Sequence, residues 1–167
     1  MAHLHKISFW YLTLFILFSV GQDFQTALTF SRSTDYAIFE SAGLNGVFVV
    51  CLTVTLVLDL AASYFVLRPR VIGFWVILVA LAFAAIYNIA VFGLASGDLE
   101  ATKAAYMASR EVRGFPANPE TANKVFSPEG MKATLGISLF FALSSLGSLA
   151  LNRWRFFPRE QSQAETE

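Results

Sequence analysis

The stretch "VTLVLDLAASYFVLRPR" (Val54–Arg70) sets the fold class of this chain. Its apolar run ends in an Arg-Pro-Arg turn, and a second apolar run begins directly afterwards at Val71. Two apolar runs of about 20 residues joined by a tight turn predict an antiparallel pair of membrane-spanning helices. Hydrophobic residues make up 56% of the 167 residues and charged residues only 14%, a balance typical of a protein surrounded by lipid.

Two more apolar runs, one near each end of the chain, complete the pattern. We therefore predict an all-α polytopic integral membrane protein: a four-transmembrane-helix bundle that forms a single domain over residues 1–157. The expected spans are residues 7–24, 44–67, 71–95 and 132–152, and the expected extracytoplasmic loops are residues 25–43 and 96–131. The second loop contains "DLEATKAAYMASREVRG", which predicts a short helix closed by Gly114. The polar residues 158–167 predict a disordered cytoplasmic tail.

Basic residues indicate how the bundle is oriented. If both termini and the turn between the second and third spans share one side, that side holds Lys6, Arg68, Arg70, Arg153, Arg155 and Arg159 in short segments. Short basic segments next to a span face the cytoplasm. The pattern thus predicts cytoplasmic N- and C-termini in a plasma or inner membrane.

The first span allows an alternative. Its strongly apolar part is short, Lys6 precedes it, and Ser19 and Gly21 are residues that a signal peptidase accepts. Residues 1–21 are therefore either a retained helix or a cleaved signal peptide. A helix that continues through "QDFQTALTF" would favour retention.

Asp59 is the acid that the predicted spans must accommodate. An aspartate at the centre of a membrane helix costs about 2.5–3.5 kcal/mol, whereas each Leu, Val or Phe contributes about 0.3–0.6 kcal/mol in return. Insertion of the second span remains favourable, but Asp59 must face other helices or water. Its expected surroundings form an intramembrane polar site with Thr55, Ser63, Ser144 and Ser145. Tyr87 and Asn88 form a secondary polar site.

A depth argument selects the partners of Asp59. Asp59 precedes Arg68 by nine residues, about 13 Å along a helix, and Ser145 precedes Arg153 by eight, about 12 Å. We therefore expect Asp59 to meet Ser145 or Ser144. In one interpretation the acid is protonated and fixes helix register; in the other it carries protons or binds a cation or amine.

Several function classes find no support in the sequence. There is no nucleophile–base pair, phosphate loop or metal-ligand cluster, so we expect no catalytic residue, no metal and no cofactor. Nucleic acid is not an expected partner, because the net charge is zero and no basic stripe is present. The expected partners are the lipid bilayer and another membrane protein or a second copy of the chain.

Two functions remain open, and a membrane-embedded enzyme ranks third. The first is a non-enzymatic accessory, assembly or scaffolding subunit, favoured because few polar groups line the predicted spans, small-residue faces for helix contacts are present, and Asp59 has no identified ionisable partner. The alternative is a small proton- or cation-linked carrier or channel component that uses Asp59.

Overall fold

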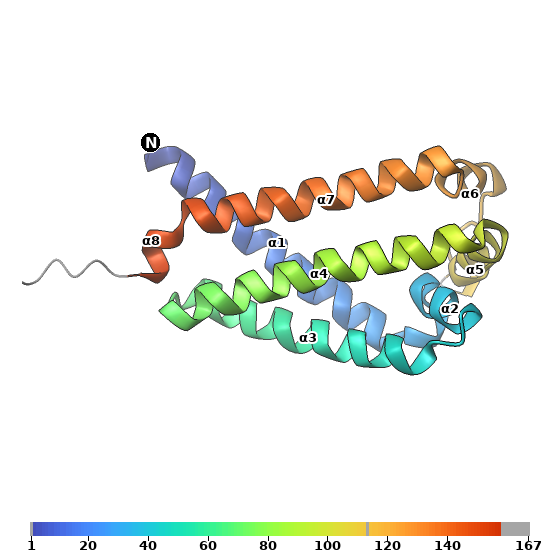
Figure 1. The fold of residues 1–167 in the computed structure, drawn as a ribbon, viewed down its shortest axis with the longest axis horizontal. Coiled ribbons are helices and arrows are strands. Elements are labelled where there is room, and N and C mark those ends of the chain that lie inside the picture. The colour runs from blue at the N-terminus through green and yellow to red at the C-terminus, as the bar shows by residue number, and fades with distance from the viewer. Residues whose placement is uncertain (1, 113, 158–167) are drawn as a thin grey trace, which may run out of the picture.

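The structure, a computed structural model, describes residues 2–112 and 114–157. Four of its helices are long and apolar enough to cross a membrane, which confirms the predicted all-α membrane bundle. Short helices connect or follow them (Figure 1). In chain order the elements are α1 (Ala2–Leu28), η1 (Phe30–Arg32), α2 (Thr34–Ser41), α3 (Asn45–Leu67), α4 (Val71–Gly97), α5 (Leu99–Val112), α6 (Pro119–Val125), α7 (Pro128–Leu151) and α8 (Arg153–Phe156).

The four long helices α1, α3, α4 and α7 form a ring. The helix α3 packs against α4, α4 against α7, α7 against α1, and α1 against α3. The α3–α4 hairpin predicted from the Arg-Pro-Arg turn is thus one side of the ring, and α7 lies opposite α3. Figure 1 shows α1 crossing the other long helices obliquely.

The two ends of the bundle differ. We call the end that holds η1, α2, α5 and α6 the cap end, and the end that holds the start of α1, the α3–α4 turn and α8 the terminal end (Figure 1). At the cap end, α2 and α5 each close on a glycine with positive φ, Gly43 and Gly114. In both turns the glycine N–H and the next N–H donate to carbonyls of the last helical turn, as in a Schellman motif.

The observed helix bounds differ from the predicted spans at both ends of the chain. The first helix covers residues 2–28 instead of 7–24, so the polar segment after Gly21 belongs to α1. The expected loop 25–43 contains the end of α1, η1 and α2. The last long helix begins at Pro128, where the Ser127 side chain accepts the N–H of Gly130.

The end of the last long helix lies close to the predicted end of the fourth span at residue 152. The helix α7 stops at Leu151, and Asn152 separates it from α8. The Asn152 side chain is fully buried and donates both to the Ser148 carbonyl and to the Ser8 hydroxyl of α1. The break therefore joins α7 to α1.

Two apolar clusters hold the bundle together, one in each half. The larger cluster fills the terminal half and joins all four long helices to α8; its buried members are Leu12, Ile16, Ala62, Val66, Ile77, Ala80, Leu81, Leu149 and Phe156. The smaller cluster joins the cap to α4 and α7 through Ile38, Ala95 and Met131. Polar side chains of the long helices lie between the two clusters.

Gly73 permits the closest approach within the α3–α4 hairpin. A Cβ atom added there would lie 2.6 Å from the Cβ of Phe65, whereas one added at Gly93 on the same helix would meet nothing within 4 Å. We expect Gly73→Ala to lower the free energy of unfolding in detergent by about 1–3 kcal/mol. Gly93→Ala is the control and should leave stability unchanged or slightly raised. Equal stability of the two variants would contradict this account of the hairpin.

Candidate intramembrane acid site

Asp59 lies inside the bundle, as the cost of placing a carboxylate in hydrocarbon requires. Its side chain is only 8% exposed, on the face of α3 that is turned toward α1 and α4. Of the two neighbouring leucines in the sequence, Leu58 is half-buried and Leu60 is exposed. The helix thus turns its polar stripe inward and its leucine-rich face outward.

The partner of Asp59 is a second acid, Asp23 of α1. The two carboxyl groups lie close enough to interact directly, and both line the same cavity. Asp23 is half-buried, and its Oδ2 atom is buried with no hydrogen-bond donor among the described residues. Since a carboxylate has no proton to donate, the two carboxyl groups can form a hydrogen bond with each other only when the pair holds at least one proton. We call Asp23 and Asp59 the acid pair.

Helix direction explains why these two residues meet. The helix α1 runs from the terminal end to the cap end and α3 runs back, so the two are antiparallel neighbours. Side chains lean toward the N-terminus of their own helix. Asp23 therefore leans toward the terminal end and Asp59 toward the cap end, and the two carboxyl groups approach each other between their backbones.

A cavity of about 250 Å³ opens beside the acid pair. We call it the acid cavity. Its walls come from α1, α2, α3 and α4, and its polar lining residues are Ser19, Gln22, Asp23, Thr26, Asp35, Thr55, Asp59, Tyr87 and Asn88. A smaller cavity of about 120 Å³ extends from Asp59 and Asn88 toward the larger apolar cluster. A water molecule occupies about 30 Å³ of liquid volume, so the acid cavity has room for several waters or a small organic ion.

The serines expected to meet Asp59 do not bond to it. The Ser144 hydroxyl donates to the carbonyl of Phe140 in its own helix. Ser145 is fully buried, and its hydroxyl has no hydrogen-bond partner among the described residues. The expected contact between Asp59 and Ser145 or Ser144 is therefore corrected. The depth argument placed the residues at similar heights, but α3 and α7 lie on opposite sides of the ring.

The other two members of the expected site flank Asp59 on α3. Thr55 lines the acid cavity, but its hydroxyl donates to the carbonyl of Cys51. The Ser63 hydroxyl is buried without a hydrogen-bond partner in the described part of the chain. Thr55 thus offers the acid cavity an acceptor oxygen, while Ser63 lies one turn beyond Asp59 and outside the cavity lining.

The secondary polar residues Tyr87 and Asn88 both line the acid cavity. The Tyr87 hydroxyl donates to Oδ2 of Asp35 in the cap at 3.0 Å, and its ring stacks on Phe39 of α2. The Asn88 amide donates to the carbonyl of Ala84, which leaves its oxygen as a possible acceptor. Tyr87 thereby ties α4 to the cap directly above the acid pair.

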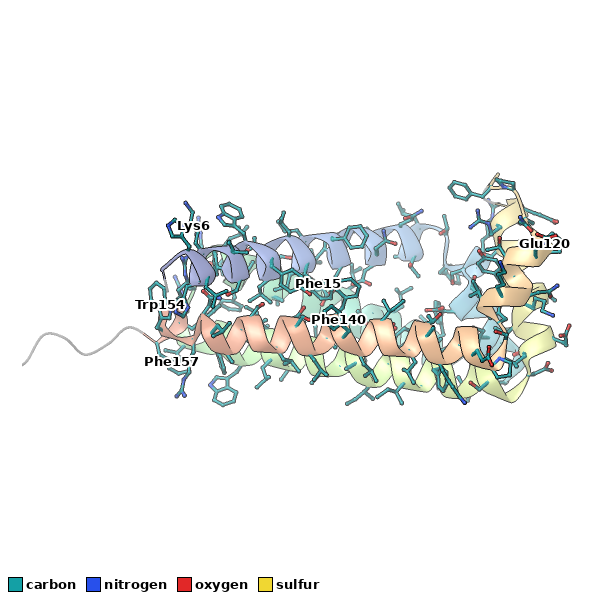
Figure 2. The ribbon with its side chains drawn as sticks, turned by 90° about the horizontal axis from the view of Figure 1, so that it is seen from above. Lys6, Phe15, Glu120, Phe140, Trp154 and Phe157 are labelled. Atoms are coloured by element: carbon teal, nitrogen blue, oxygen red, sulfur yellow. The ribbon has the colours of Figure 1, made fainter. Side chains whose placement is uncertain are left out.

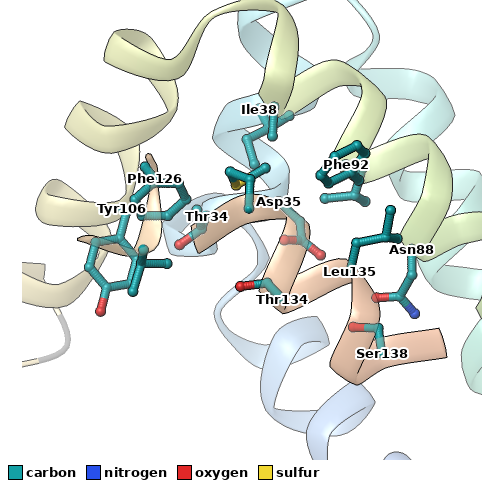
Figure 3. A pocket seen from close by; sticks show the side chains of 14 residues that line it. Thr34, Asp35, Ile38, Asn88, Phe92, Tyr106, Phe126, Thr134, Leu135 and Ser138 are labelled. Atoms are coloured by element: carbon teal, nitrogen blue, oxygen red, sulfur yellow. The ribbon is translucent and has the colours of Figure 1, made fainter. Parts of the chain in front are cut away.

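A second cavity of about 260 Å³ lies between the cap, α4 and α7, and we call it the cap cavity (Figure 3). Asp35 and Asn88 line both this cavity and the acid cavity. Figure 3 shows Thr134 and Ser138 of α7 on the same side as Asp35 and Asn88, with apolar Ile38 and Phe92 nearby. A line of oxygen-bearing side chains therefore leads from the cap to Asp59.

The sequence analysis missed Asp23 and Asp35. Asp23 fell at the margin of a first span that was assigned too few residues, and Asp35 fell in an expected loop. A signal for Asp23 was present: "QDFQTALTF" continues the first helix without a glycine or proline. Asp35 carries no comparable signal, because its helix α2 has only 8 residues.

The acid cavity is lined by three carboxyl groups and by hydroxyl and amide groups that supply further oxygen atoms as acceptors. Among the described residues, no group of three or more His, Cys, Asp and Glu side chains is arranged to hold a metal ion. Comparison with protein-family models, curated proteins and solved structures gives no match for the chain.

Proposed function

We propose that this membrane protein is a small proton- or cation-linked carrier or channel component, and that the acid pair is its binding site. The observation that carries the proposal is the contact between Asp23 and Asp59 beside a cavity inside the bundle. Ionisable side chains within membrane spans are costly and mark proton or ion pathways by default. Two acids from different helices at one point double that cost, and apolar residues of similar size would pack there more cheaply.

The acid pair can exchange a bound proton for a monovalent cation. With the shared proton it carries one negative charge, which suits a single monovalent cation in the acid cavity. Loss of that proton leaves two negative charges, which hold a cation more strongly. Cation binding therefore opposes proton binding, and a carrier with such a site exchanges the two.

The accessory-subunit alternative depended in part on Asp59 having no ionisable partner in the spans. Asp23 supplies that partner, and this removes one reason for preferring a purely structural role. A purely structural bond would also leave no need for the acid cavity or for the polar line that continues to Asp35 (Figure 3). We therefore favour the carrier.

We further propose that the terminal end faces the cytoplasm. The described basic residues of that end are Lys6, Arg68, Arg70, Arg153 and Arg155, and none of the described acids lies there. The cap end carries seven described acids and five described basic residues: Asp35, Glu40, Asp98, Glu100, Glu111, Glu120 and Glu129 against Arg32, Lys103, Arg110, Lys124 and Lys132. This asymmetry agrees with the positive-inside rule. In that orientation the acid cavity, which reaches Asp35 of the cap, lies toward the outer side.

Neutralising either acid should abolish exchange. We expect liposomes containing the full-length protein and a pH-sensitive dye to show proton flux when sodium, potassium or tetramethylammonium chloride is added outside. Asp59→Asn and Asp23→Asn should reduce this flux to the level of protein-free liposomes, because an amide cannot take up and release the proton. Glu120→Gln, an exposed acid of the cap, is the control and should retain the flux. Full flux in both aspartate variants would overturn the proposal.

The shared proton has a spectroscopic signature of its own. A protonated carboxylic acid absorbs in the infrared apart from a carboxylate, so the folded wild-type protein at neutral pH should show one such band. Asp59→Asn should remove it, because an asparagine amide can donate to the Asp23 carboxylate without an extra proton. A band of unchanged intensity in this variant would show that the proton lies elsewhere.

Orientation can be tested with single cysteines. In a Cys51→Ser background, His3→Cys marks the terminal end and Glu120→Cys the cap; both positions are exposed, and neither substitution changes the number of Lys and Arg residues. A membrane-impermeant maleimide applied to intact cells should label only the cap position. Labelling of the terminal position instead would reverse the proposed orientation.

A further inference from the structure

The terminal end contains a cavity unrelated to the acid pair. It has a volume of about 420 Å³ and is lined by His5, Lys6, Phe9 and Trp10 of α1 together with Trp154 and Arg155 of α8. We call it the interface cavity, because tryptophans and basic residues at the end of a bundle lie at the level of the lipid head groups. Figure 2 shows Lys6 and Trp154 close together at this end, with Glu120 at the other end of the molecule.

Two hydrogen bonds, one of them buried, join the two walls of the interface cavity. The Asn152 amide donates to the Ser8 hydroxyl at 2.6 Å, and a ring nitrogen of His5 lies 3.0 Å from the Leu151 carbonyl. The rings of His5 and Trp154 meet edge to face. The break in the helix at Asn152 thus places Trp154 and Arg155 beside the first turns of α1.

The Arg155 guanidinium is held by ring stacking, and no acid of the described residues pairs with it. It lies 4.0 Å from the centre of the Phe9 ring and 5.0 Å from the Trp154 ring, and stacking of this kind leaves the guanidinium edge available for a bidentate acceptor. Its Nε atom is buried and meets no acceptor in the described part of the chain. The only ion pair between described side chains joins Glu100 and Lys103 in the cap, so Lys6 and Arg155 have none.

We infer that the interface cavity binds the phosphate of an anionic phospholipid from the leaflet next to the terminal end. Basic pockets between membrane helices at this level suit acidic lipid head groups, and a phosphate diester offers the paired oxygens that a guanidinium edge recognises. The neighbouring exposed side chains Ile7, Trp10 and Leu14 provide an apolar surface along α1 on which the acyl chains of the same lipid can lie. A lipid fits this combination of cations and apolar surface better than free phosphate does.

Lipid titration of the purified full-length protein in neutral detergent, read by native mass spectrometry, tests this inference. We expect phosphatidylglycerol to bind as one tight equivalent and phosphatidylcholine to bind more weakly. Each cation near a charged lipid accounts for about a fivefold change in affinity, so Lys6→Gln/Arg155→Gln should weaken phosphatidylglycerol binding by roughly 30-fold. Equal binding of the two lipids to the wild-type protein would overturn the inference.

The matched control is Arg68→Gln/Arg70→Gln. It removes the same charge from the same end of the bundle, but neither residue lines the interface cavity. A much smaller effect of this control supports a defined site, whereas an equal effect reduces the binding to general surface charge and overturns it. If the Arg155 variant does not fold, Lys6→Gln alone, at an exposed position outside the stack, should still weaken binding about fivefold.

Two further arms identify the occupant. Inorganic phosphate and glycerol phosphate at millimolar concentration should not displace phosphatidylglycerol; displacement would assign the site to a soluble phosphate. The chain's own tail carries the acids Glu160, Glu165 and Glu167, which lie outside the described residues. If phosphatidylglycerol binds only when these three are replaced by Gln, the tail is the occupant and the lipid assignment fails.

Discussion

Carboxyl groups cannot remain in hydrocarbon, and this constraint determines which helices of the bundle are neighbours. Asp59 sits in the middle of an otherwise apolar helix, so α3 must turn that face toward other protein groups. Asp23 on α1 supplies the contact, and a proton held by the pair would relieve the repulsion between the two acids. The oblique path of α1 (Figure 1) and the acid cavity are consistent with this single contact between antiparallel neighbours.

The elements of the fold could be predicted because lipid imposes strict requirements on sequence. Every backbone polar group must be satisfied within the membrane, so long apolar runs can only be helices. Arg68, Pro69 and Arg70 fix the α3–α4 hairpin. Ser127 as N-cap and Pro128 in the first helical position fix the start of α7. Each of these features depends only on residues that are adjacent in the sequence.

The site could be predicted only in part, because helix order around a ring is not a local property. Asp59 was identified from its cost in lipid, and Tyr87 and Asn88 from their polarity within an apolar helix. The depth argument gave Asp59 and Ser145 similar heights, but height does not say which helix is adjacent. Asp23 was missed for a different reason: it lay at the margin of the predicted first span, although the helix continues beyond it to Leu28.

The cap illustrates a further limit of sequence analysis. The helix α2 is too short to be stable alone, and its form depends on burying Ile38 and Phe39 and on the glycine turn at Gly43. Neither contact can be inferred from the eight residues themselves. Asp35 therefore accepts the hydrogen bond from Tyr87 only once the cap has packed on the bundle.

The position of the polar groups between two separate apolar clusters matters for the proposed exchange. The larger cluster holds α1, α3, α4, α7 and α8 together in the terminal half, and the smaller one joins the cap to α4 and α7. Hydration of the acid pair therefore does not require either cluster to open. The Tyr87–Asp35 hydrogen bond and the stacked rings of Tyr87 and Phe39 lie on the cap side of the acid pair. The fold thus combines a packed terminal half with a polar cavity on the cap side of the acid pair, an arrangement that suits the proposed exchange.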